Sequence, residues 1–162
     1  MVSWIKNYLL EQEIKRNPKI TKQFIAWDKV QSAVIVTDSS RLNTVSQFVK
    51  QSGRNFDSII SFNDKISLDK NCFLSVNKKD FLISGLPKPE ILQKIRSKSF
   101  DVLINFDFNN SVQLKALSGL TGARCKVGPD VVDYKSYFDI SILSNEAEFL
   151  NQALKYLMMI KS

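Results

Sequence analysis

The apolar positions of this chain follow two spacings, one typical of strands and one typical of helices. Short continuous runs rich in β-branched residues predict strands that are buried on both faces. These runs are Ala33–Thr37, Ser58–Phe62, Phe73–Val76, Val102–Phe106, Arg124–Val127 and Ile140–Leu143. Between them, apolar residues recur every three or four positions, which predicts amphipathic helices. We therefore expect an α/β fold: a three-layer α/β/α sandwich, Rossmann-like, around a mostly parallel sheet of about five or six strands.

The predicted helices are recognised by their apolar faces. Residues 1–17 form an N-terminal amphipathic helix, which Asn17-Pro18 closes. The faces, in chain order, are Trp4, Ile5, Tyr8 and Leu9; Leu42, Val45, Phe48 and Val49; Ile91, Leu92 and Ile95 after Pro89; Val112, Leu114 and Leu117; and Leu150, Ala153, Leu154, Leu157 and Met158. No linker or change of composition interrupts this pattern, so residues 1–162 are expected to form a single domain.

Other residues predict how the elements end. Gly53, Gly119 and Gly122 stand where glycine commonly caps a helix, and Asn145 with Glu148 is typical of a capping box. A pattern Phe-Asp-x-x-Ile recurs at residues 56–60, 100–104 and 138–142. Its aspartates, Asp57, Asp101 and Asp139, fall at the amino ends of strands, where they can accept backbone N–H bonds. We expect them to be structural.

Composition narrows the class of protein. The chain has 162 residues, of which 44% are hydrophobic and 24% charged, as in globular domains. It has no apolar run of about 18 residues and no signal-peptide pattern, so we expect a cytoplasmic protein. Cys72 and Cys125 lie far apart in predicted strands and are expected to be small buried hydrophobes. The chain has no histidine, which removes the commonest general base and metal ligand.

The formal net charge of +7 raises the question of an anionic partner. The basic excess lies in residues 1–30 and 61–100, mixed with acidic residues and without a nucleic-acid-binding module. Lys78-Lys79 with Phe81 is the nearest approach to one, so nucleic acid is not an expected partner. Glu11 and Glu13 also weaken the case for a membrane contact by the first helix. We expect that helix to pack on the domain or on a second copy, as in a homodimer.

The candidate site follows from where polar residues succeed strands. Carboxyl ends of parallel strands meet at one edge of a sheet, where ligands usually bind. The residues expected there are Asp38, Asp64 and Asp107, accompanied by Ser39, Ser40, Asn63, Asn109 and Asn110. Such oxygen-rich groups suit a magnesium ion or sugar hydroxyls. The alternative is that Asp38 and Asn109 or Asn110 only cap the following helices.

Motifs for bound cofactors are missing from the sequence. Dinucleotide-binding and phosphate-binding loops place glycines between a strand and the next helix, whereas Gly119, Gly122 and Gly128 follow a helix or surround a strand. A receiver-type phosphorylation site would need an acidic pair after the first strand, where only Asp38 stands. We therefore predict no cofactor and no resident metal.

Two resemblances add to this picture. Phe100–Asn105 and Leu117–Gly128 resemble part of the acceptor-side domain of lipopolysaccharide heptosyltransferases, which implies half of a GT-B-type fold. Asn105 replaces that family's usual acidic residue, and Thr37-Asp38-Ser39 lacks the glycine of its first turn. The family's donor-binding domain would follow after Ser162, where this chain stops.

A wider resemblance covers residues 4–160. Its main segments are Ile35–Asp38, Asn77–Asp80, Phe100–Asn105, Lys126–Gly128 and Tyr137–Asp139. Together they resemble a bacterial family of short proteins known only as a domain of unknown function. This resemblance implies a bacterial, cytoplasmic setting and no catalytic residues.

Our leading functional hypothesis is a non-catalytic binding or interaction module for a partner or a small polar ligand. The candidate ligand-binding residues are Asp38, Ser39, Asp64, Asp107 and Asn109. The alternative is a small transferase or hydrolase, related to glycosyltransferases, in which Asp38, Asp64 and Asp107 share a metal. A third hypothesis is a polyanionic partner bound by the basic surface.

Overall fold

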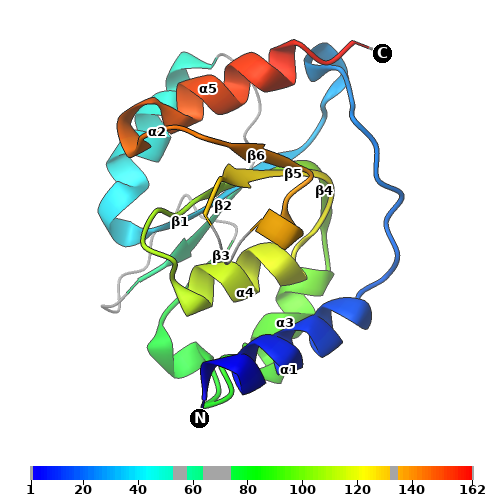
Figure 1. The fold of residues 1–162 in the computed structure, drawn as a ribbon, viewed down its shortest axis with the longest axis vertical. Helices are drawn as coiled ribbons and strands as arrows, with labels where there is room; N and C mark the ends of the chain where they lie inside the picture. The colour runs from blue at the N-terminus through cyan, green and yellow to red at the C-terminus, as the bar shows by residue number, and fades with distance from the viewer. Residues whose placement is uncertain (1, 53–57, 64–73, 132–134, 162) are drawn as a thin grey trace.

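The computed structural model describes residues 2–52, 58–63, 74–131 and 135–161, which form a six-stranded parallel sheet between two layers of helices (Figure 1). The strand order is β3-β2-β1-β4-β5-β6, and every neighbouring pair is parallel. The strands are β1 (Ala33–Asp38), β2 (Ser58–Phe62), β3 (Leu74–Val76), β4 (Ser99–Phe106), β5 (Gly122–Pro129) and β6 (Ile140–Ile142). The α/β, Rossmann-like fold predicted from the sequence is confirmed.

Five α-helices cover the sheet within the described residues. They are α1 (Ser3–Lys15), α2 (Leu42–Gln51), α3 (Pro89–Arg96), α4 (Val112–Leu120) and α5 (Glu146–Met158). Single 3-10 turns occupy Trp27–Lys29, Ser39–Arg41, Lys78–Asp80 and Lys135–Tyr137. α1, α3 and α4 lie on one face of the sheet, and α2 and α5 lie on the other (Figure 1). No helix among the described residues is both long and apolar enough to cross a bilayer.

The continuous apolar run of β1 is explained by burial on both faces. Val34 and Val36 belong to the core beneath α3 and α4, whereas Ala33 and Ile35 belong to the core beneath α2 and α5. Successive strand residues point to opposite faces, so both phases of β1 must be apolar. β4 follows the same rule from Val102 to Ile104.

The apolar face predicted for α1 does not pack on the domain, which leaves packing on a second copy as a prediction. Trp4 and Tyr8 are 67% and 56% exposed, and the helix packs on the domain through Leu10 and Ile14. On the same side of α1, the Asn7 Oδ1 accepts a hydrogen bond of 2.9 Å from Lys115 Nζ of α4. The residues with the largest apolar surface therefore point away from the core.

Two predicted glycine caps were also wrong. Gly119 lies inside α4, Gly122 begins β5, and the described glycine with positive φ is Gly85. A Cβ added to Gly119 would lie 2.7 Å from Ile14 Cδ1, and one added to Gly122 would lie 2.4 Å from Ile20 Cδ1. These glycines allow the N-terminal segment to approach the sheet closely. Gly53 lies outside the described residues.

The structural aspartates are confirmed where they are described. Asp101 Oδ2 accepts backbone N–H bonds from Gln31 and Ser32, at 2.8 and 3.3 Å. Asp139 Oδ2 accepts one from Lys126 in β5, at 2.8 Å. Both carboxylates thus fix chain segments at the amino edge of the sheet. Asp57, the third member of the pattern, lies outside the described residues.

Other local predictions have mixed outcomes. Asn145 caps α5 by accepting a 2.9 Å bond from the Glu148 amide. The reciprocal capping box, however, is at Asn77 and Asp80, around a 3-10 turn. Cys125 is a buried free thiol, as expected, and burial raises its pKa to about 11. Cys72 lies outside the described residues.

Candidate functional site

The strand order places a topological switch point between β1 and β4. From β1 the chain continues to β2 on one side, and from β4 it continues to β5 on the other. Thr37 pairs in register with Phe106, and its hydroxyl donates a 3.3 Å bond to the Phe106 carbonyl. The residues that follow, Asp38 and Asp107, therefore leave the sheet side by side. In open α/β sheets this crevice is the usual place for a ligand.

Asp38 ends β1 and organises the turn into α2. Its Oδ1 accepts bonds from the Ser40 amide, at 3.0 Å, and from the Ser40 hydroxyl. Its Oδ2 binds Arg41 Nη1 in an ion pair. Asp38 thus caps the 3-10 turn that precedes α2, as one of the two sequence interpretations predicted.

Asp107 is completely buried and holds the loop that leads into α4. Its two oxygens accept backbone N–H bonds from Asn109 and Ser111, at 2.9 and 2.8 Å. Ser111, whose Oγ accepts from the Leu114 amide at 3.3 Å, is the N-cap of α4. The predicted cap at Asn109 or Asn110 was therefore wrong; Asn110 instead takes a left-handed conformation, with φ 55°.

Asp38, Ser39 and Asn109 surround one cavity of about 240 Å³. Ser40, Phe62, Ser111 and Leu114 complete its lining. Three of the five candidate ligand-binding residues thus converge on one cavity. The carboxylate of Asp107 fixes two of the lining residues, because it accepts hydrogen bonds from the backbone amides of Asn109 and Ser111.

The other candidate residues at this edge have different surroundings. Asp64 lies outside the described residues. Asn63, directly after β2, is buried and donates from Nδ2 to Ser75 Oγ of β3 at 2.6 Å. Within the described part of the chain, no group of three or more acidic, cysteine or histidine side chains is arranged to hold a metal ion.

Arg41 is a site residue that the sequence analysis missed. It is only 9% exposed, binds Asp38 and Glu146, and lies with its guanidinium carbon 5.7 Å from the centre of the Phe106 ring. Burial alone would lower the pKa of Arg41, but the hydrogen bond to Glu146 and the charge of Asp38 raise it above its usual value. Arg41 therefore stays charged and shares its positive charge between Asp38 and Glu146.

The cavity offers hydrogen bonding more than charge. Among the described residues that line it, Asp38 is the one ionisable residue, and it is paired with Arg41. Hydroxyls of Ser39 and Ser40 and the amide of Asn109 can both donate and accept. Phe62 and Leu114 provide an apolar wall. This combination suits a small neutral molecule with several hydroxyl groups.

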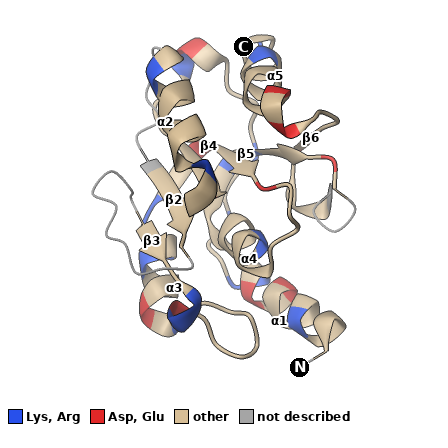
Figure 2. Ribbon diagram, turned by 90° about the vertical axis from the view of Figure 1, so that its left-hand side faces the viewer, with Lys and Arg blue, Asp and Glu red and all other residues tan. Residues whose placement is uncertain are grey.

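Basic and acidic residues are interspersed over the helices rather than gathered at this site. Figure 2 shows both signs along α1 and α3. In α3, Glu90 precedes Lys94 and Arg96, and in α1 the Glu13 carboxylate pairs with Arg16 at 2.8 Å and with Arg96 at 3.1 Å. The basic excess is thus partly compensated where it was expected to be strongest.

An open parallel sheet in this order, with a polar cavity at its switch point, defines a Rossmann-like α/β domain. A family model described as "Family of unknown function (DUF6913)" matches residues 3–160, and the chain belongs to that family. Neither a curated protein nor a solved structure gave a match. The bacterial setting and the local resemblance to heptosyltransferases stay predictions.

Proposed function

We propose that this protein is a non-catalytic binding domain that takes a small, neutral, hydroxyl-rich ligand at the switch point between β1 and β4. The observation that carries the proposal is the convergence of Asp38 and Ser39, at the end of β1, with Asn109, in the loop after β4, on one cavity of about 240 Å³. A cavity of this size lies just below the usual range for ligand sites, about 300–1,000 Å³, and fits a sugar or polyol rather than a nucleotide.

Different lining residues can bind different parts of such a ligand. Asp38 accepts from a ligand hydroxyl, and Asn109 can accept from one hydroxyl and donate to another. Phe62 and Leu114 can pack against the C–H face of a sugar ring. Because Arg41 already binds one oxygen of Asp38, and the Ser40 amide and hydroxyl bind the other, the site favours a neutral ligand over a cation.

The engagement of the carboxylates favours binding over catalysis. Both oxygens of Asp107 hold backbone amides, and both oxygens of Asp38 have protein partners. A metal-dependent transferase or hydrolase would need these oxygens to be available for a cation. A metal-dependent enzyme is therefore our second hypothesis. In it, Asp64 would be the third carboxylate, beside Asp38 and Asp107, that holds the metal.

Titration of the ¹⁵N-labelled protein with neutral monosaccharides and polyols tests the proposal. We expect saturable shifts of the Ser39, Ser40 and Asn109 amide signals. Asn109→Ala should weaken binding about tenfold, because a ligand hydroxyl loses its partner. Asn151→Ala, which changes an exposed asparagine on α5, is the matched control and should bind normally.

Two results would contradict the proposal. One is the absence of any shift at these amides with the whole panel of ligands. The other is turnover of a sugar nucleotide or phosphoester that depends on added Mg²⁺ and is lost in Asp38→Asn, which would favour the enzyme.

A cytoplasmic location and a homodimer also belong to this proposal. The buried free thiol of Cys125 supports a reducing compartment. Trp4 and Tyr8, exposed on α1, supply an apolar surface on which a second copy could pack. Sedimentation of the protein and of Trp4→Ser tests the dimer, since the substitution should lower the average mass of a dimer formed through α1.

A further inference from the structure

A second cavity lies at the opposite, amino edge of the sheet, beneath the segment that joins α1 to β1. We call residues 16–26 the N-terminal arm. The hydrogen bonds that hold the arm on α4 and β5 include Asn17 Nδ2 to the Leu120 carbonyl at 2.7 Å, Lys22 Nζ to the Ala123 carbonyl at 3.2 Å, and the Gln23 amide to the Arg124 carbonyl at 3.2 Å. The arm is therefore a fixed wall of this cavity.

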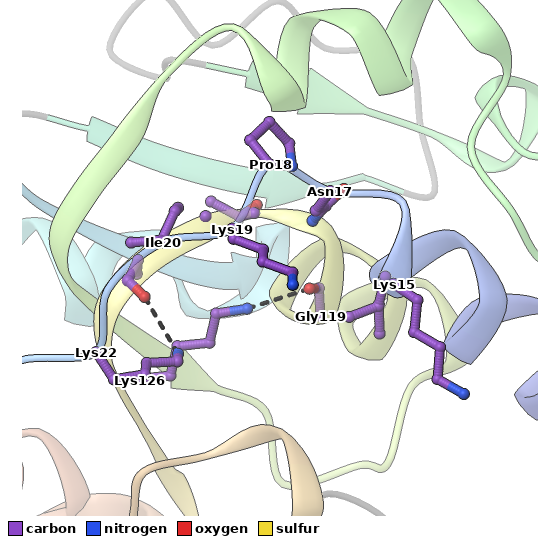
Figure 3. A pocket seen from close by; sticks show the side chains of 12 residues that line it. Lys15, Asn17, Pro18, Lys19, Ile20, Lys22, Gly119 and Lys126 are labelled. Atoms are coloured by element: carbon purple, nitrogen blue, oxygen red, sulfur yellow. Dashed lines mark hydrogen bonds between the residues drawn. The ribbon is translucent and has the colours of Figure 1, made fainter.

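The cavity has a volume of about 490 Å³, within the range of ligand-binding sites. Its apolar lining includes Ile14, Ile20 and Ala123. Its polar lining includes four lysines from three parts of the chain: Lys15, Lys19, Lys22 and Lys126 (Figure 3). Gly119 and Gly122 also line it, with Ile14 and Ile20 packed closely against them.

Lys126 is the buried cation of this group. It is 8% exposed, and its Nζ donates to the carbonyls of Ser118 and Gly119 at 2.8 and 3.1 Å. An ammonium group has three N–H donors, so one remains for a ligand. Burial and, to a lesser degree, the charge of Lys22 lower the pKa of Lys126 to about 7, against the opposing effect of Asp139.

Lys19 is the second anchor. It is exposed, and it makes no hydrogen bond or ion pair with the part of the chain that the structure describes. Figure 3 shows Lys19 and Lys126 extending toward the same part of the cavity, beside Gly119, whereas Lys15 points away. Lys22 differs from both, because it pairs with Asp139 at 3.2 Å.

We propose that this cavity is a second binding site, which takes an amphipathic anion: one carboxylate or phosphate group attached to an apolar body. The anionic group binds between Lys19 and Lys126, and the apolar body packs on Ile14, Ile20 and Ala123. A bound anion supplies the negatively charged partner that the buried Lys126 ammonium lacks. The apolar body of the ligand removes the apolar lining from water. The site lies at the other edge of the sheet from the proposed sugar site and does not depend on it.

Octanoate and octyl phosphate, titrated into the ¹⁵N-labelled protein below their micelle concentrations, test the site. We expect saturable shifts at the Gly119, Gly122 and Ala123 amides with at least one of them, and the stronger binder identifies the head group. Octan-1-ol lacks the anionic group, and inorganic phosphate lacks the apolar body. Each should therefore bind at least about tenfold more weakly.

Substitutions then test the two anchors. Lys19→Met should weaken the binding of the better probe about tenfold, since Lys19 is exposed and its loss leaves the fold intact. Lys155→Met, on the exposed side of α5, is the matched control and should bind normally. Lys126→Met should weaken binding further; if it does not fold, the Lys19→Met titration and the amide shifts decide.

Three outcomes would overturn the proposal. The first is no shift at the three amides with either probe. The second is equal binding of octan-1-ol and octanoate, or of inorganic phosphate and octyl phosphate, because only half of the proposed ligand would then be recognised. The third is unchanged binding in Lys19→Met.

Discussion

The guanidinium of Arg41 binds the carboxylate of Glu146, a residue 105 positions later in the chain, at the start of α5. The same guanidinium binds Asp38 at the end of β1. A single side chain thus connects the edge of the candidate sugar site to the C-terminal helix. Asp38 has a fixed position because Arg41 is fixed by α5.

Replacing Arg41 by methionine should destabilise the fold by about 1–3 kcal/mol. The substitution removes two ion pairs and leaves Asp38, which is largely buried, without its cation. The estimate is below that for a fully buried pair, because Glu146 is half exposed and water screens its charge. Urea unfolding measures the change.

Arg16→Met is the control for Arg41→Met. Arg16 also pairs with a glutamate, Glu13, but its side chain is 71% exposed. Its loss should cost less than about 1 kcal/mol. Equal effects of the two substitutions would show that the contacts of Arg41 do not stabilise the fold.

Asp107→Asn should also destabilise the protein, by about 1–3 kcal/mol. The carboxylate accepts two backbone amides, and an asparagine amide would turn a donor toward one of them. Asn109→Ala, in the same loop but exposed, should change the stability by less than about 0.5 kcal/mol. Unchanged stability of Asp107→Asn in thermal unfolding would show that these two hydrogen bonds do not stabilise the fold.

The strands and part of the candidate site could be predicted because their signals are local. β1 and β4 are buried on both faces, so their residues are apolar in both phases and the run is visible in the sequence. Asp38 ends β1, and Asn109 lies in the loop that follows β4. The carboxyl ends of parallel strands share an edge, so their meeting could be expected once the sheet was predicted to be parallel.

The remaining features depend on contacts between distant residues. Arg41 has the sequence context of an exposed residue, and its partner Glu146 is known only from the fold. Lys126 lies in a predicted strand, but its hydrogen-bond acceptors are carbonyls at the end of α4. The helical spacing of Trp4 and Tyr8 identified a helix and could not determine which side of it faces the domain.

The glycines of β5 and α4 allow a prediction that follows from close packing. Gly128→Ala should destabilise the protein by about 1–3 kcal/mol, because the added Cβ would lie 2.2 Å from Cε2 of Phe138. Three atoms of that ring lie within 2.5 Å of the new Cβ, and a rigid ring can move away only as a whole. Thermal unfolding measures the loss.

Gly119→Ala is the comparison for Gly128→Ala. Its nearest contact, Cδ1 of Ile14 at 2.7 Å, is the end of a flexible side chain, and alanine is favoured over glycine inside a helix by about 1 kcal/mol. The two effects oppose each other, so the net change should be smaller than for Gly128→Ala. Adding Ile14→Val, which removes Cδ1, should make Gly119→Ala less costly than it is in the wild-type background. The reverse order of the two glycine variants would contradict this account.

Lys126 should make the stability of the fold depend on pH between about 7 and 9. Its pKa is lowered in the folded state from 10.5 to about 7, chiefly by burial, with Lys22 adding to the shift and Asp139 opposing it. Above pH 7 the unfolded chain therefore binds more protons at this position than the folded chain. Stability rises with pH wherever the unfolded state binds more protons, so the contribution of Lys126 increases from pH 7 upward.

Urea unfolding at several pH values tests this dependence, with Lys126→Met as the variant and Lys155→Met as the exposed control. The chain has no histidine, so few other groups titrate in this window. Above pH 9 the buried Cys125, whose pKa is raised from 9.0 to about 11, acts in the opposite direction, because the folded state then keeps a proton that the unfolded state loses. The rise between pH 7 and 9 should persist in Lys155→Met and flatten in Lys126→Met. An unchanged slope in Lys126→Met would show that Lys126 is charged in the folded protein throughout this range.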